Sequence, residues 1–405
     1  MLSDLIVRVA GPKSSCASRQ TRAIALTLAF LLLIARLQQA RAENHVDYRY
    51  EDYQEDNARM HIQTHAIAFG FKLNSMVEVD GELVYDAVSG ATPGGALPTP
   101  GTRNWLTTIN PDVRKAGNVA VAIGWGANTT TPQFSYSLEN DYESFGYSVN
   151  HTIDFNEKNT TLALGGAFTH DINFAKTLGG DRRHKDSGDL LLGVTQLLGP
   201  KTILTANLTL GIANGYLDDP YKAVHIPYYP DPLNPDPTAV TFGEKRPRER
   251  TKQIGYLSLT QFVTPLNGSL EATYRLYHDS YDVLSHTVGL NWYQKIGKHV
   301  ILAPMFRFTD QSAAKFYMTQ LPGDYTLNDP LDPFYAPLPE LYSSDYRLAA
   351  LQSFTYGISA TITIKERFSI DLGYKRYQMQ GKDSMTSGAL FPSANIFSIG
   401  GRIWF

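Results

Sequence analysis

The sequence predicts an all-β fold: a transmembrane, antiparallel, up-and-down β-barrel of about sixteen strands. Three observations support this prediction: a regular alternation of apolar and polar residues, connections that alternate between short and long, and an export-signal pattern near the N-terminus. Alternation with a period of two is typical of a strand whose two faces meet different surroundings. In a membrane barrel these surroundings are lipid and lumen, which agrees with the low mean hydropathy of −0.24.

Residues 1–42 have the organisation of a cleaved secretory signal peptide. Basic residues precede an uncharged, mostly apolar stretch over 23–35, and the motif Ala40-Arg41-Ala42 follows it. A basic region, a short apolar region and a small-residue cleavage site define such signals. The apolar stretch is shorter than the roughly 20 residues of a membrane-spanning helix, and a buried N-terminal helix is the alternative interpretation. We therefore expect residues 43–405 to form one exported domain.

The composition excludes several other classes of protein. One cysteine in 405 residues excludes a disulfide scaffold. A net charge of −3 leaves no basic excess for binding nucleic acid. An aromatic content of 12% with 19% charged residues argues against global disorder.

The alternation is cleanest in residues 353–364, where apolar side chains at even positions alternate with Ser, Thr and Gly at odd positions. A soluble β-sandwich would alternate as well. The connection lengths, the export signal and the lack of a helical pattern after residue 42 favour the barrel. The predicted strands cover residues 45–55, 59–73, 76–87, 117–126, 131–140, 145–155, 160–170, 187–197, 201–212, 249–263, 268–278, 283–295, 299–310, 347–364, 367–379 and 392–405. Fourteen or eighteen strands also fit, because the first segment is weak.

The connections predict a barrel with short periplasmic turns and long extracellular loops, which is typical of bacterial outer-membrane barrels. Long loops are expected over about 88–116, 171–186, 213–248, 311–346 and 380–392. The last strand ends in Phe405, which resembles the terminal signal that the barrel assembly machinery of Gram-negative bacteria reads. We therefore expect an outer-membrane location, in contact with lipid and lipopolysaccharide.

Sixteen strands enclose a lumen wide enough for water unless loops fill it, so inward side chains should be polar. By parity, one predicted strand carries an acidic stripe on its inner face, and basic residues on other strands would face it. We interpret this pattern as the charged constriction of a porin-like channel for small solutes. The alternative is a plugged barrel in which the charges only satisfy each other. The lumen candidates are Glu78, Asp80, Glu82, Asp86, Arg275 and Arg307, and further inward charges are Glu139, Asp154, Arg250, Lys252, Glu271, Lys375 and Arg402.

The long loops are rich in Pro, Tyr and Asp, most densely over 228–237 and 323–333. Their carboxylates could bind Ca²⁺, but no known calcium-binding repeat is present, so we expect solvated loops and neither a metal nor a cofactor. The basic segments 182–185 and 246–250 could form rims that meet lipopolysaccharide phosphates, although ordinary solvation is the simpler interpretation.

A hydrolase is the third hypothesis, after the channel and the plugged barrel. Asp279, Ser280, Ser285 and His286 lie close in sequence, but no nucleophile elbow, zinc spacing or phosphate-binding loop accompanies them. We therefore expect no enzyme activity. A hydrolase would lose its activity on His286→Ala while still folding.

Several segments along the mature chain resemble the bacterial domain-of-unknown-function family 3570. They are residues 84–93, 136–144, 192–196, 215–222, 246–250, 274–279 and 311–317. The resemblance implies an outer-membrane barrel without an assigned activity. Members of this family tend to be encoded near small exported redox-associated proteins, which implies an envelope protein partner for a plugged, scaffolding barrel. The proline-rich loop at 223–243 is larger than in the family, so specificity carried by this loop need not transfer.

The most specific family string covers residues 86–93, where a strand leaves the membrane. Gly90 permits a positive φ, and Pro93 stiffens the chain. The side chains of Asp86, Ser89 and Thr92 could cap the amides of the turn. The string fits a structural turn and a ligand site equally well.

Overall fold

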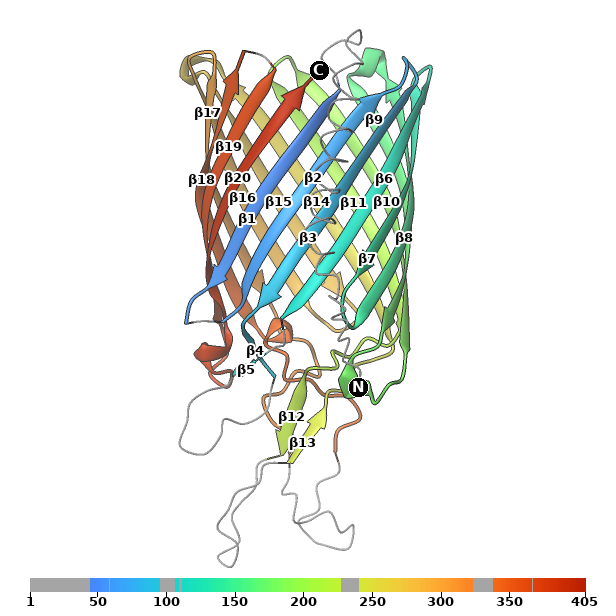
Figure 1. The fold of residues 1–405 in the computed structure, drawn as a ribbon, viewed down its shortest axis with the longest axis vertical. Coiled ribbons are helices and arrows are strands. Elements are labelled where there is room, and N and C mark those ends of the chain that lie inside the picture. The colour runs from blue at the N-terminus through green and yellow to red at the C-terminus, as the bar shows by residue number, and fades with distance from the viewer. Residues whose placement is uncertain are drawn as a thin grey trace, which may run out of the picture.

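The computed structural model describes residues 44–57, 59–94, 106–108, 111–226, 240–322, 338–365 and 367–405. Sixteen strands form one closed barrel in the ring order β1-β2-β3-β6-β7-β8-β9-β10-β11-β14-β15-β16-β17-β18-β19-β20 (Figure 1). β1 pairs with β20 in antiparallel register, so the sheet closes without a free edge. The predicted fold class is confirmed. The predicted signal peptide lies outside the described residues.

The barrel strands are mostly twelve to fourteen residues long and lie tilted side by side around the ring. Two short hairpins, β4–β5 and β12–β13, lie in the loops. The barrel strands are β1 His45–Glu55, β2 His61–Lys72, β3 Val77–Ser89, β6 Asp112–Trp125, β7 Asn128–Leu138, β8 Tyr142–Phe155, β9 Thr160–Asn173, β10 Arg183–Gly199, β11 Thr202–Gly215, β14 Glu249–Val263, β15 Gly268–Asp279, β16 Leu284–Ile296, β17 Val300–Gln311, β18 Leu351–Ile364, β19 Phe368–Gly381 and β20 Ser393–Trp404. The hairpin strands are β4 Ala91–Pro93, β5 Leu106–Thr108, β12 Ala223–Ile226 and β13 Val240–Gly243.

Several strands run further than the sequence predicted. β6 begins at Asp112 and β10 at Arg183, each several residues before its expected start. β18, in contrast, begins only at Leu351, four residues after its expected start. The residues before it form the short 3-10 helix Tyr346–Leu348, which starts where the Asp345 side chain accepts a hydrogen bond from the Arg347 amide.

The alternation of side chains gives the barrel an apolar outer wall. Large apolar residues such as Leu83, Leu190 and Ile399 are exposed, and they occupy the outward positions of β3, β10 and β20. Directly paired residues of antiparallel strands point to the same face, so the register assigns the inner wall from strand to strand. One inward row runs from Gly193 through Asn207 and Tyr256 to Arg275. No helix among the described residues is long and apolar enough to span a membrane.

The two ends of the barrel differ, as the sequence predicted. Seven short turns, the start of β1 and the end of β20 lie at the same end of the barrel, at the top of Figure 1. We call this end the short-turn end. Residues with positive φ shape these turns, including Gly126, Asn267 and Gly297. The long connections lie at the opposite end, which we call the loop end.

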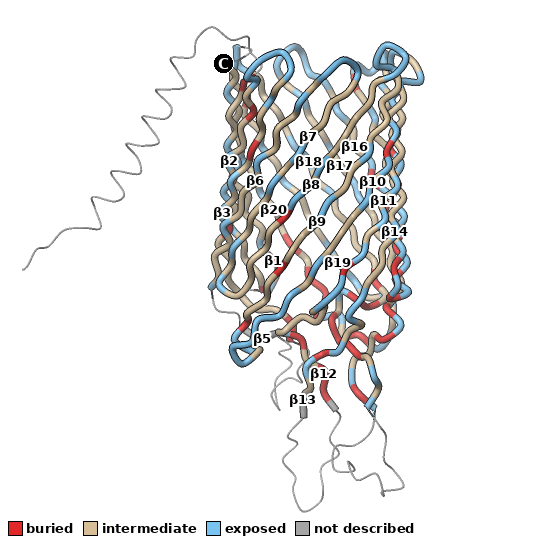
Figure 2. The backbone as a smooth tube through the Cα atoms, turned by 90° about the vertical axis from the view of Figure 1, so that its right-hand side faces the viewer, coloured by how far each residue is buried: buried red, intermediate tan, exposed pale blue. Residues whose placement is uncertain are grey.

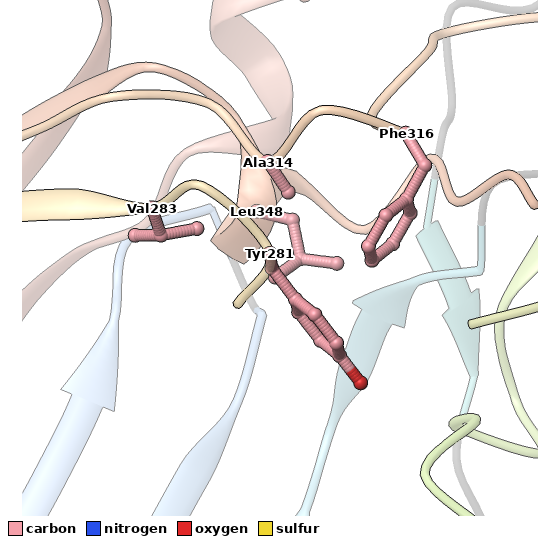
Figure 3. Packing of buried hydrophobic residues seen from close by; sticks show 5 residues of the cluster. All are labelled: Tyr281, Val283, Ala314, Phe316 and Leu348. Carbon is pink, nitrogen blue, oxygen red and sulfur yellow. The ribbon is translucent and has the colours of Figure 1, made fainter. Parts of the chain in front are cut away.

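The described loop segments fold into a compact body at the loop end, which we call the cap: residues 216–226, 240–248, 280–283, 312–322 and 338–350. Figure 2 shows that buried segments concentrate there. One apolar cluster, drawn in Figure 3, joins Tyr281, Val283, Ala314, Phe316 and Leu348. A second cluster joins Val224, Leu321 and Tyr342. These loops are therefore held by their own side chains, as expected for loops that pack like a small core.

We expect Gly90→Ala to destabilise the loop end of the barrel. Gly90 has a φ of +118°, and an added Cβ would lie 2.2 Å from the carbonyl oxygen of Arg59. Strain of this kind costs about 2 kcal/mol or more. The measurement is the urea midpoint of the folded barrel in detergent, followed by its shifted mobility on unheated gels.

Gly126→Ala is the matched control, because Gly126 has a φ of +59° and an added Cβ would meet no atom within 4 Å. Gly126→Ala should therefore cost only the strain of a positive φ, about 1 kcal/mol, with no steric clash. Equal midpoints for the two variants would show that the contact with Arg59 is unimportant.

Candidate functional site

The acidic stripe of β3 lies on the inner wall of the barrel. Asp86 is buried and accepts a hydrogen bond from Arg114 Nε of β6 at 2.7 Å. Glu78, Asp80 and Glu82 follow on the same face toward the short-turn end. Among the residues that the structure describes, no ion pair engages these three carboxylates. They therefore place negative charge on one side of the lumen, where Lys72 of β2 lies directly opposite Glu78 in the register.

The predicted basic residues lie on the inner faces of β15, β17 and β19. The register leads from Arg275 through Thr287 to Thr309, and Arg307 lies two residues from Thr309 toward the short-turn end. Across the next two strands the register leads from Arg307 through Thr355 to Tyr377, and Lys375 again lies two residues from Tyr377 toward the short-turn end. In a barrel whose strands tilt by 35–45°, a step of about one residue per strand keeps side chains at one height. These three cations therefore form a level arc.

The arc begins opposite the stripe, on β15, and then approaches it, because only five strands lie between β17 and β3 and three between β19 and β3. Seven strands separate β3 from β15 in either direction around the ring. In the described part of the chain no carboxylate is within ion-pair distance of Arg275, Arg307 or Lys375, although Arg275 lies over the Tyr277 ring at 5.4 Å. Charges of opposite sign on different parts of the inner wall produce an electric field across the lumen. Their role in a constriction stays a prediction.

The other predicted inward charges are satisfied by neighbours. Arg402 pairs with Asp47 at 2.6 Å, and Lys252 with Asp189 at 3.1 Å. Their side chains keep exposed fractions of 42% and 27%. These fractions show that the described inner wall is not closely packed around the two pairs. Asp154 accepts a hydrogen bond from Thr161, Glu271 from Asn291 and Tyr293, and Arg250 donates to Asp279.

Glu139 lies outside the sheet, in the short connection between β7 and β8. Burial raises the pKa of Glu139, and the neighbouring carboxylate of Asp112 adds to this effect. Asp112, Glu139 and Asp141 have carboxylate oxygens within 4.8 Å of one another. Such a set can hold a metal ion, but exposed acidic groups also gather without one.

The family string at residues 86–93 forms a structural exit from β3. The Ser89 hydroxyl donates to the His61 carbonyl at 3.5 Å, and Gly90 adopts the positive φ that its sequence position predicted. Thr92 and Pro93 belong to β4, and the Pro93 carbonyl accepts a hydrogen bond from the Lys222 ammonium of the cap. In the described structure the side chains of Asp86 and Ser89 bond to Arg114 and His61 rather than capping the amides of a turn.

A buried ionic network holds the cap together. Arg246 pairs with Glu244 at 2.7 Å and with Asp345 at 2.8 Å, and Arg347 pairs with Asp345 at 2.6 Å. Burial opposes the charge on Asp345, but the Arg347 hydrogen bond and the surrounding cations outweigh it and hold its pKa at about 2. This carboxylate therefore stabilises the cap fully above its unfolded pKa, and the stabilisation is lost progressively as the pH falls from there through about 2.

The hydrolase candidates do not converge. Asp279 is fully buried and bonds to Arg250, Tyr277 and the amides of Tyr281 and Val283. Ser285 points into the barrel and His286 out of it, because neighbours in a strand face opposite sides. The His286 ring meets the Tyr274 hydroxyl at 2.7 Å on the outer face. Ser280 lies in the cap, and its hydroxyl oxygen accepts a hydrogen bond from the Thr251 amide. A nucleophile and base within reach of each other are not found among these four.

The basic segments meet inside the barrel rather than on its rim. Arg183 and Lys185 of β10 line one cavity together with Arg246 and Arg250. The sequence prediction missed this because it started β10 at residue 187. Extending the alternation backward by four residues would have placed Arg183 and Lys185 inside and His184 outside.

Phe405 lies at the short-turn end of the barrel. Its amide donates to the Asn44 carbonyl at 2.9 Å, and its ring centroid is 6.1 Å from that of Phe71. Its role in assembly stays a prediction. The proline-rich segments at 228–237 and 323–333 lie outside the described residues.

The closed barrel, its apolar outer wall and its polar inner wall define an outer-membrane type of β-barrel. The chain belongs to the family described as "Protein of unknown function (DUF3570)", whose model matches residues 23–182 and 171–396. The resemblance seen in the sequence is thus confirmed. No curated protein matches the sequence.

Solved structures share the fold at low sequence identity. CdiB from Acinetobacter baumannii is similar with a TM-score of 0.50 and 9% identity, covering 90% of this chain and 61% of CdiB. The siderophore receptor PirA from Pseudomonas aeruginosa has a TM-score of 0.40 and 9% identity, covering 90% of this chain and 63% of the receptor. OmpTdeltaL8, a loop deletion mutant of the Vibrio cholerae outer membrane protein OmpT, has a TM-score of 0.40 and 9% identity, covering 90% and 98%. This chain thus spans less than two thirds of PirA and CdiB, and the likeness shows the fold alone.

We expect Asp345→Asn to open the cap. The change removes the charge that pairs with Arg246 and Arg347, and breaking a buried ion pair costs about 3–5 kcal/mol. The amides of Leu321 and Ser343, which bond to the carbonyls of His225 and Phe316, should then exchange with deuterium at least about 100-fold faster. Mass spectrometry of the folded barrel measures this exchange.

Asp282→Asn is the matched control for the cap. Asp282 pairs with Lys315 at 3.7 Å, and both side chains are more than half exposed, so its loss should cost less than about 1 kcal/mol. Unchanged exchange in Asp345→Asn, or equal effects of both variants, would contradict the role assigned to the buried network.

Proposed function

We propose that this protein is an outer-membrane channel that passes small charged or polar solutes through a solvated lumen. The observation that carries the proposal is the presence of two charge rows of opposite sign on the inner wall whose members have no ion-pair partner among the described residues. Charges without partners in a plugged interior would be costly, whereas a water-filled lumen tolerates them and uses them to select ions. The outward apolar belt, the short turns and the predicted export signal support a location in the outer membrane, with insertion by the barrel assembly machinery.

The cap adds a constraint to this channel. It lies at the loop end, which is the extracellular side in an outer-membrane orientation. A solute entering from outside must pass between the cap and the inner wall. The cap therefore restricts the size of solutes that enter, while the charge rows act further inside.

The second candidate is a capped barrel that does not conduct and serves an envelope protein partner. The folded cap favours it, because loops that pack into a core of their own present a fixed surface. The two candidates differ in one observable property, the conductance of the isolated barrel.

We expect the purified protein to give steady single-channel conductance in a planar bilayer. In Glu78→Gln/Glu82→Gln the permeability ratio of K⁺ to Cl⁻ should fall at least about twofold, because the change removes negative potential from one wall of the lumen. Asp52→Asn is the control. Asp52 is a carboxylate on the outer face of β1, bonded to His61 and Tyr50, and its loss should leave the ratio unchanged.

The basic row provides a test of opposite sign. Arg275→Gln/Arg307→Gln should raise the K⁺ to Cl⁻ ratio by a similar factor, measured in the same bilayers. A ratio unchanged by both double variants would keep the channel but remove the charge rows from its selectivity. A folded barrel without conductance would contradict the channel and favour the scaffold.

A further inference from the structure

A cavity of about 320 Å³ lies inside the barrel at the loop end, between the inner wall of β8–β14 and the cap. Cations dominate its lining, with two carboxylates, Asp171 and Asp218, among them. Tyrosine side chains line it as well, and the Tyr281 hydroxyl donates to the Pro247 carbonyl at 3.2 Å. The basic residues are Arg183, Lys185, Arg246, Arg250 and Lys252, and the tyrosines are Tyr142, Tyr216 and Tyr281.

Three of the five cations that line the cavity are more exposed than their carboxylate partners. Asp279, the partner of Arg250, has an exposed side-chain fraction of 0%, against 27% for Arg250. Asp171 is 8% exposed, against 31% for its partner Lys185. Arg246 is 11% exposed, and its partners Glu244 and Asp345 are at most 1% exposed. In these three cases the carboxylate is the more buried partner, and the more exposed cation lines the cavity.

Donor groups remain free for a ligand. Arg250 uses Nε and one terminal nitrogen on Asp279, and no described hydrogen bond engages its other terminal nitrogen. Lys185 donates to Tyr142 at 3.2 Å and pairs with Asp171 at 2.8 Å, which leaves one of its three N–H groups. Burial raises the pKa of Tyr216 to about 12, so its hydroxyl stays protonated and can donate.

We propose that this cavity binds a small oxyanion with at least two negative charges, of the chemistry of phosphate and phosphate monoesters. Converging guanidinium and ammonium groups form short, charge-assisted hydrogen bonds with such oxygens. The cavity volume admits phosphate with a small substituent and excludes large polyanions. The site lies inside the barrel wall, where a free solute can reach it. The inference stands whether or not the barrel conducts.

The test is calorimetric titration of the folded barrel in detergent with inorganic phosphate and, separately, with glycerol 3-phosphate. Sodium chloride at equal ionic strength controls for general screening. We expect saturable binding of at least one phosphate compound by the wild type. In Arg183→Gln/Lys252→Gln the dissociation constant should rise at least tenfold.

These two positions suit the test because their partners stay solvated when they are replaced. Asp181 and Asp189 have exposed fractions of 66% and 37%, so the double variant should fold, and its shifted mobility on unheated gels checks this. Lys315→Gln/Lys382→Gln is the matched control: it also removes two cations from exposed pairs, but outside the cavity. Absence of binding by the wild type, or equal weakening in both double variants, would overturn the proposal.

Discussion

The structure depends on one constraint: in a bilayer, every backbone N–H and C=O group must find its partner within the protein. A sheet meets this demand only when its first and last strands pair. Here β1 and β20 pair along their whole length, from His45 with Trp404 to Glu55 with Ala394. Closure forces each strand to expose one face to lipid and the other to the lumen. The separation of apolar outer residues from charged inner residues follows from this requirement.

The inner wall separates its charges into two kinds. Some are neutralised locally, as in the pairs of Arg402 with Asp47 and Arg114 with Asp86. Others, the carboxylates of β3 other than Asp86 and the cations Arg275, Arg307 and Lys375, have no such partner in the described residues. The first kind stabilises the wall, and the second kind leaves an electric field that a solute in the lumen would meet. The loop end uses the same principle in reverse, because the buried carboxylates Asp171 and Asp279 anchor Lys185 and Arg250, whose remaining donors line a cavity.

Much of the barrel could be predicted from sequence, since period-two alternation reports directly on two-faced strands. This alternation alone was enough to place the side chains of Glu82 and Arg275 on the inner wall. The cap could not be predicted in this way, because the contact of Tyr281 with Phe316 joins two irregular connections that have no periodicity. The cavity was missed for a different reason. Arg183 and Lys185 lie on an extension of β10 beyond its expected start, so they were interpreted as rim residues.

The central claim is that the inner wall faces water and the outer wall faces lipid. Cys16, the one cysteine of the sequence, lies in the predicted signal peptide, so single cysteines placed in the barrel can be probed one at a time. The most direct measurement is the reaction of Glu82→Cys and Leu83→Cys with a charged, membrane-impermeant thiol reagent in liposomes. These neighbours on β3 point to opposite faces. The account predicts rapid labelling at residue 82 and none at residue 83. Labelling of neither position would contradict a solvated lumen, and labelling of residue 83 alone would contradict the assignment of the faces.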